Sequence, residues 1–127
     1  MRRVFKTRHF ARWMRKTELN DAMLCQAVSE MERGLIDADL GGGVLKKRIA
    51  LPGRGKRGGI RTLVATNQGD RWFFVFGFEK KVRANVSAKE LAALQALATD
   101  LLKLSSTELD HQVERNALSE MGDDHTD

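Results

Sequence analysis

Three apolar segments between positions 41 and 78 constrain the fold of this chain more than any other feature. Positions 44–50, 60–67 and 72–78 are rich in β-branched, aliphatic and aromatic residues, which favour β-strands. Glycine clusters bound them, and the sequence Asn67-Gln68-Gly69-Asp70, typical of a tight turn, separates the second segment from the third. The sequence therefore predicts three consecutive strands, with the last two forming a hairpin.

Capping signals predict helices on both sides of these strands. Thr7 and Asn20 are suitable N-caps for helices over about 8–16 and 21–33, and positions 3–6 fit a short strand before them. After the strands, Ser87 and Ser105 each begin a capping box, and the second helix is expected to continue to about position 121. A chain of 127 residues can build one core, so the sequence predicts a single α+β domain.

Cations are concentrated on the predicted strands. Because side chains alternate between the faces of a strand, Lys46 and Arg48 share one face and Lys47 lies on the other. Arg61 is on the next strand, about 4.8 Å away if the two strands pair. Such a cluster disfavours folding unless an anion binds it, so we expect a phosphate-binding face.

The charge of the whole chain is also asymmetric. Positions 1–16 and 41–69 each hold seven Lys or Arg and no acid, whereas positions 85–127 hold nine acids and three bases. The net charge is +5. This pattern favours a polyanion such as nucleic acid as the partner of the basic half; a solvated surface without a ligand is the alternative.

The glycine-rich segment 52–59 contains a formal match to the dinucleotide-binding fingerprint at Gly53, Gly55 and Gly58. That fingerprint has to open a helix after a strand, and here it leads into another strand, so we reject it. The segment suits close approach of the backbone to phosphates, and a plain flexible hairpin loop is an equal alternative.

Several other classes of protein are excluded. The three histidines and the single Cys25 are dispersed, which predicts no metal site, no cofactor and no internal disulfide. No catalytic Ser-His-Asp or Cys-His set can be argued. No apolar segment is long enough to span a bilayer, and no signal peptide is recognisable. We therefore expect a cytoplasmic protein that does not bind membranes.

Three segments together resemble the RelE/HigB branch of the bacterial type II toxins, in the RelE/ParE superfamily. They are Leu40-Gly41-Gly42-Gly43-Val44-Leu45-Lys46-Lys47-Arg48-Ile49-Ala50, then Pro52-Gly53-Arg54-Gly55-Lys56 through Gly59-Ile60-Arg61-Thr62-Leu63, then Phe76-Gly77-Phe78-x-Lys80. The resemblance implies a RelE-like α+β fold with N-terminal helices, an antiparallel sheet of three to four strands and a C-terminal helix. Positions 1–105 would form the toxin domain, and 106–127 a helical extension and acidic tail.

The resemblance also implies a function. Members of this family enter the ribosomal A site and cut mRNA without a metal, because the 2′-hydroxyl of the RNA attacks the adjacent phosphate. The implied partners are mRNA, the ribosome and a cognate antitoxin, expected to be a HigA-like helix-turn-helix protein. A ParE-like inhibitor of DNA gyrase and a generic RNA-binding protein are the alternatives. The cations that this chain shares with the family favour the nuclease, because a protein that acts by binding alone does not need several cations to converge on one site.

By resemblance, Lys46 and Arg48 match a catalytic pair in which one residue is the general base and the other stabilises the transition state. Arg61 matches the arginine that holds the scissile phosphate, and Lys80 or Lys81 the group that protonates the leaving oxygen. The family has lysine at position 48, and arginine is a poor base because its pKa stays above about 12. Lys46 is therefore our first choice for the base.

Lys47 is the second choice for the general base. At the position of Ser87 the family has a tyrosine that stacks on a nucleobase of the RNA. This chain therefore has a reduced set of catalytic residues. The residues expected to bind RNA are Lys47, Arg54, Lys56, Arg57 and Arg83.

Overall fold

The computed structural model describes residues 2–53 and 59–122. Over these residues the chain forms four helices and one sheet of six strands, which confirms the predicted α+β class. The helices are α1 (Arg8–Met14), α2 (Asp21–Glu32), α3 (Ala88–Leu102) and α4 (Ser106–Glu114). The strands are β1 (Arg3–Thr7), β2 (Ala38–Asp39), β3 (Val44–Ile49), β4 (Ile60–Thr66), β5 (Arg71–Glu79) and β6 (Leu118–Met121).

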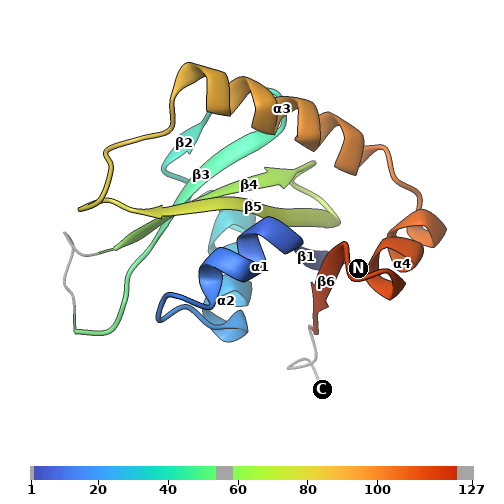
Figure 1. The fold of residues 1–127 in the computed structure, drawn as a ribbon, viewed down its shortest axis with the longest axis horizontal. Coiled ribbons are helices and arrows are strands. Elements are labelled where there is room, and N and C mark those ends of the chain that lie inside the picture. The colour runs from blue at the N-terminus through green and yellow to red at the C-terminus, as the bar shows by residue number, and fades with distance from the viewer. Residues whose placement is uncertain (1, 54–58, 123–127) are drawn as a thin grey trace.

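The order of strands across the sheet is β2-β3-β4-β5-β1-β6 (Figure 1). β1 runs parallel to β5, and the other neighbouring pairs are antiparallel. β4 and β5 form the predicted hairpin, and Gln68 in its turn has a φ of 59°. The three central strands thus follow the sequence prediction, with boundaries that differ by a residue or two.

The predicted helix starts are confirmed by the cap geometry. The side chains of Thr7 and Asn20 accept hydrogen bonds from main-chain N–H groups in the first turns of α1 and α2. Ser87 and Ser105 each form a complete capping box with the glutamate three residues later. These bonds satisfy N–H groups that have no partner within a helix.

The helices cover both faces of the sheet, with α1 and α2 on one face and α3 and α4 on the other (Figure 1). β5 contributes to the hydrophobic cores on both faces of the sheet, because its successive side chains point to opposite faces. Trp72 and Phe74 are buried towards α1 and α2, whereas Phe73 and Val75 are buried towards α3 and α4. No helix in the described part of the chain is long and apolar enough to cross a membrane.

Two expectations about the architecture are corrected. The sheet has six strands over the described residues, not three to four, because β1, β2 and β6 extend the central three. The last helix ends at Glu114 instead of continuing to position 121, because Asn116 has a φ of 61° and turns the chain away from the helix. Leu118 and Met121 then bury their side chains as β6 pairs with β1, so the sheet edge determines the conformation here.

Candidate active site

The candidate active site lies on the face of β3 and β4 that also carries α3. Arg48 is the direct cross-strand partner of Arg61, and Lys46 is the partner of Leu63, so all three cations project from the same face. Like charges directly opposite each other destabilise an antiparallel pair. An anion bound between them relieves this repulsion, so the register supports a phosphate site.

The guanidinium of Arg61 is the most unusual group on this face. Its Nη1 is buried and has no hydrogen-bond partner among the described residues. A buried donor without a partner costs about 1–3 kcal/mol, and more when the group is charged. A bound oxyanion would supply the missing acceptor, because guanidinium matches phosphate geometry with two parallel hydrogen bonds.

Arg48 is positioned by its neighbours on both sides. Its main-chain N–H donates to the carboxylate of Asp37, and its side chain lies over Gly59, where an added Cβ would come within 2.9 Å of Nε. Glycine at 59 thus leaves room for the Arg48 side chain beside β4. In the described residues, no carboxylate forms an ion pair with Lys46 or Arg61.

Lys80 and Lys81 directly follow β5, whose Phe78 is the cross-strand partner of Arg61. Both lysines are exposed, and Lys81 Nζ lies 3.9 Å from the carboxylate of Glu79. The structure therefore brings these two cations to the same end of the sheet as Arg61. Both lysines lie on a solvated turn at that end of the sheet.

Arg83 is held in place by other groups of the chain. It donates two hydrogen bonds to the carboxylate of Glu90, one from Nη1 to Oε2 at 3.1 Å. Its guanidinium also lies 5.8 Å from the ring centroids of Phe76 and Phe78, within the range of a cation–π contact. Arg83 thus anchors the segment after β5 to the first turn of α3. Sequence reasoning identified Glu90 only as a capping residue.

The hydrogen bonds from Arg83 and from the Ser87 backbone lower the pKa of Glu90 from 4.5 to about 2. A carboxylate whose pKa is depressed by folding contributes stability above its unfolded pKa and loses it as the pH falls towards the folded one. We therefore expect the melting temperature of the wild type to exceed that of Glu90→Gln at pH 6, and the gap to close between pH 4.5 and 2. Thermal unfolding followed by circular dichroism will measure this difference in melting temperature. A difference that does not change with pH would contradict the assignment of a lowered pKa to Glu90.

Lys47 lies on the opposite face, away from Lys46, Arg48 and Arg61. It is buried, pairs with Glu30 at 2.8 Å, and donates to the main-chain oxygen of Leu35 at 2.9 Å. The hydrogen bond from Lys47 lowers the pKa of Glu30. Lys47 therefore joins α2 to β3, and we leave it out of the proposed catalytic and RNA-binding sets.

Lys46→Met and Lys47→Met form a matched pair of substitutions at adjacent lysines. We expect Lys47→Met to lower the stability by about 1–2 kcal/mol, less than for a fully buried pair because Glu30 is partly solvated. If the chain cleaves RNA, as its resemblance to RelE-like toxins implies, Lys47→Met should keep that activity within about threefold. Lys46→Met should keep the melting temperature and reduce cleavage by at least about 100-fold. Equal losses of activity in Lys46→Met and Lys47→Met would contradict the assignment of catalysis to only one face of β3.

Three predicted RNA-binding cations, Arg54, Lys56 and Arg57, lie outside the described residues. Sequence reasoning missed the stack of His9 on Phe76, whose ring centroids are 5.9 Å apart with an interplanar angle of 8°. It also missed an apolar groove beside α3. Neither feature has a local signal, because each joins residues that are far apart in the sequence.

A model of a known protein family matches nearly the whole chain. The family model described as "RelE toxin of RelE / RelB toxin-antitoxin system" matches residues 2–121, and so includes the whole sheet and all four helices of the described structure. No curated protein matches the chain. Because the family match covers nearly the whole sequence, the chain belongs to the RelE toxin family, whose members pair with an antitoxin.

Proposed function

We propose that this chain is a ribosome-dependent mRNA endoribonuclease that acts in the cytoplasm, inhibits translation and arrests growth. The observation that carries the proposal is the direct opposition of Arg48 and Arg61 on one face, with Arg61 Nη1 buried and without a partner among the described residues. A face of this kind favours a ligand with concentrated negative charge. The scissile phosphate of RNA meets that requirement, and its charge increases in the transition state.

In the proposed reaction the ribose 2′-oxygen attacks the adjacent phosphorus and the 5′-oxygen of the next nucleotide leaves. Arg61 binds the non-bridging oxygens, and Arg48 stabilises the added charge because arginine is too weak an acid to exchange a proton near neutral pH. Lys46 accepts the proton of the 2′-hydroxyl. Lys80 or Lys81 donates a proton to the departing oxygen. The products are a 2′,3′-cyclic phosphate and a 5′-hydroxyl, and no step uses a metal.

The ribosome supplies what this reduced set lacks. The proposed acid–base groups of this set are lysines, whose ordinary pKa of about 10.4 lies far from neutrality. Alignment of the 2′-hydroxyl with the phosphate can contribute about 7–11 kcal/mol to lowering a barrier of this kind. We propose that binding in the ribosomal A site provides this alignment for mRNA. A helix-turn-helix antitoxin of the HigA type would neutralise the enzyme.

Mapping mRNA ends after a brief induction of the protein tests the proposal. We expect new 5′-hydroxyl ends within translated regions, in register with codons, and matching 2′,3′-cyclic phosphates upstream. Uninduced cells serve as the control, and ribosome-free RNA should stay intact with the purified protein. Growth arrest without new ends would refute the nuclease and direct attention to DNA gyrase, the target of the related ParE toxins.

A further inference from the structure

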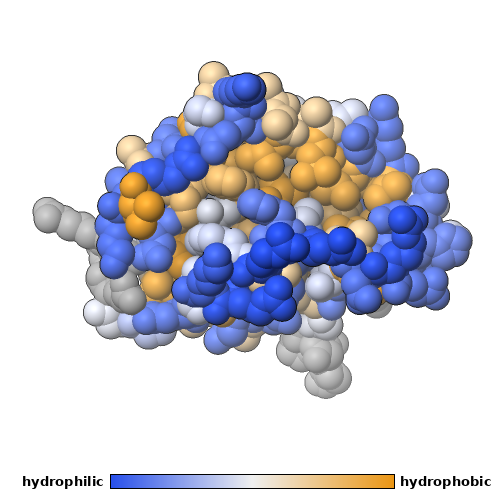
Figure 2. Space-filling model, viewed as in Figure 1, coloured by the Kyte–Doolittle hydropathy of each residue, from blue (hydrophilic) through white to orange (hydrophobic). Residues whose placement is uncertain are grey.

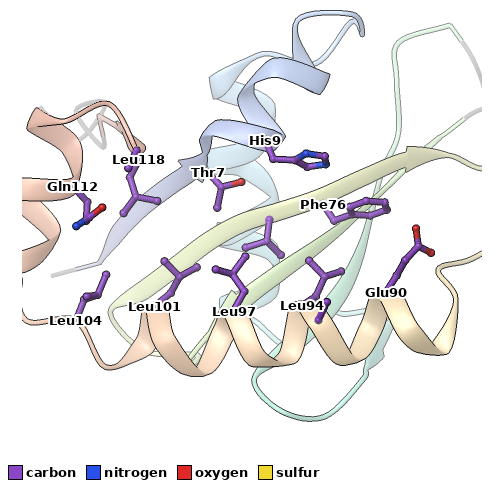
Figure 3. A pocket seen from close by; sticks show the side chains of 13 residues that line it. Thr7, His9, Phe76, Glu90, Leu94, Leu97, Leu101, Leu104, Gln112 and Leu118 are labelled. Atoms are coloured by element: carbon purple, nitrogen blue, oxygen red, sulfur yellow. The ribbon is translucent and has the colours of Figure 1, made fainter.

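The two sides of the proposed phosphate site differ in how they can hold its cations. Towards β1 and α1 the face is apolar: Figure 3 shows Phe76, Leu94 and Leu97 lining a groove between β5 and α3, and Figure 2 shows the apolar surface below α3. Apolar side chains pack without directional bonds. On the other side the sheet ends in β2, a strand of two residues. The support of β3 at this edge therefore depends on the segment around β2.

The segment that leads from α2 into β2 bonds to three successive residues of β3. Its Leu35 main-chain oxygen accepts from Lys47 Nζ at 2.9 Å. The main-chain N–H of Asp37 donates to the main-chain oxygen of Lys46 at 3.0 Å. The carboxylate of Asp37 accepts from the main-chain N–H of Arg48. Two of these three bonds thus hold the main chain at residues of the proposed catalytic set, and Asp37 makes both.

The bond to Arg48 comes from a side chain because β2 is too short to supply a main-chain acceptor. Ala38 is the cross-strand partner of Lys46, so two more residues of β2 would bring Ile36 opposite Arg48. Ile36 lies instead in a turn, where its main-chain N–H donates to the oxygen two residues earlier at 3.0 Å. The Asp37 carboxylate takes the place of the missing strand, and a charged acceptor makes the stronger hydrogen bond.

We propose that Asp37 is a positioning residue of the active site. Its carboxylate fixes the main chain at Arg48 and so keeps the Arg48 side chain beside that of Arg61, where both face the phosphate. The inference rests on the proposed nuclease function, and it assigns a role to a residue that does not itself touch the RNA. Asp37 acts through Arg48, from the edge of the sheet opposite β5.

Arg48 needs such support for two reasons. It is the last residue but one of β3, and the ends of strands open most easily. It also lies directly opposite Arg61, and repulsion between the two cations favours separation of β3 from β4 at this point. Gly59 confines the Arg48 side chain, since an added Cβ there would lie 2.9 Å from Nε and 3.3 Å from Cγ. The bond from Asp37 holds the main chain to which that confined side chain is attached.

Asp37→Ala and Asp39→Ala form a matched pair. Both aspartates are exposed and both accept from a main-chain N–H, but Asp39 Oδ1 bonds to Gly41 at 3.0 Å, at the other end of β3. On programmed ribosomes we expect Asp37→Ala to lower kcat about 10- to 30-fold with KM within about twofold, because a small displacement of a catalytic group is costly. Asp39→Ala should keep both constants within about threefold. Asp37→Asn keeps an acceptor oxygen and should recover kcat to within about threefold of wild type.

Hydrogen exchange of the Arg48 amide, followed by NMR on the intact chain without RNA, tests the bond itself. We expect exchange to be at least about tenfold faster in Asp37→Ala and within about twofold of wild type in Asp39→Ala. This measurement does not depend on cleavage. If the wild type cleaves no mRNA, the nuclease function fails by itself, and faster exchange in Asp37→Ala still supports the support of Arg48 by Asp37.

Four results would overturn the proposal. They are wild-type kcat in Asp37→Ala, equal losses of kcat in Asp37→Ala and Asp39→Ala, no recovery in a folded Asp37→Asn, and unchanged exchange of the Arg48 amide in Asp37→Ala. The second would reduce the effect to general destabilisation of this edge of the sheet. The third would assign it to the negative charge of Asp37 and not to its hydrogen bond.

Discussion

Replacing Arg61 with alanine is expected to abolish growth arrest and lower mRNA cleavage by about 100- to 1000-fold, the usual loss when one preorganised donor to a developing charge is removed. Stability should not fall. The substitution removes the buried Nη1 that has no partner among the described residues, and it removes the repulsion with Arg48 across the strands. A gain in melting temperature together with a loss of activity would indicate that the residue is retained for catalysis.

Arg33→Ala is the matched control for this measurement. Arg33 is exposed at the end of α2, on the other side of the sheet, so its loss should leave cleavage unchanged. Arg61→Lys keeps the charge and loses the bidentate geometry, and should retain intermediate activity. Full activity of Arg61→Ala on programmed ribosomes, with the fold verified by circular dichroism, would rule out the proposed phosphate site.

The sequence predicted the central part of this fold because its signals are local. Glycine clusters and the turn at 67–70 delimit β3, β4 and β5, and capping residues such as Thr7 and Ser87 define the helix starts. The edges of the sheet were predicted less well. β6 forms because β1 offers an unpaired edge, and that edge exists only once β1 has paired with the distant β5. The prediction of a helix over positions 115–121 could not take this pairing of β6 with β1 into account.

The candidate site shows the same division between local and distant information. Alternation along β3 separated Lys47 from Lys46 and Arg48, as the structure places them. The pairing of Lys47 with Glu30 depends on how α2 packs, and the pairing of Arg83 with Glu90 depends on the course of the chain between β5 and α3. Neither partner could be assigned from spacing alone, because each pairing depends on how elements distant in the sequence pack together.

The second large effect is expected at Gly77, on β5 between Phe76 and Phe78. An added Cβ would lie 2.2 Å from Cζ3 and 2.5 Å from Cη2 of Trp13, whose ring packs against the core and lies 5.4 Å from that of Phe10. We expect Gly77→Ala to destabilise the protein by about 2–3 kcal/mol, because the indole must leave its site. The melting temperature should fall by about 10 °C.

A double-mutant cycle identifies the cause of that loss. The φ of Gly77 is outside the positive range, so alanine fits the backbone and the Trp13 ring alone opposes it. In a Trp13→Ala background, Gly77→Ala should therefore be neutral or stabilising by up to about 1 kcal/mol, because it reduces the freedom of the unfolded chain. Gly69→Ala, where an added Cβ meets Asn67 Oδ1 at an ordinary 3.5 Å, is the control and should cost little. Equal losses in both backgrounds would show that backbone conformation, and not the contact with Trp13, requires glycine at 77.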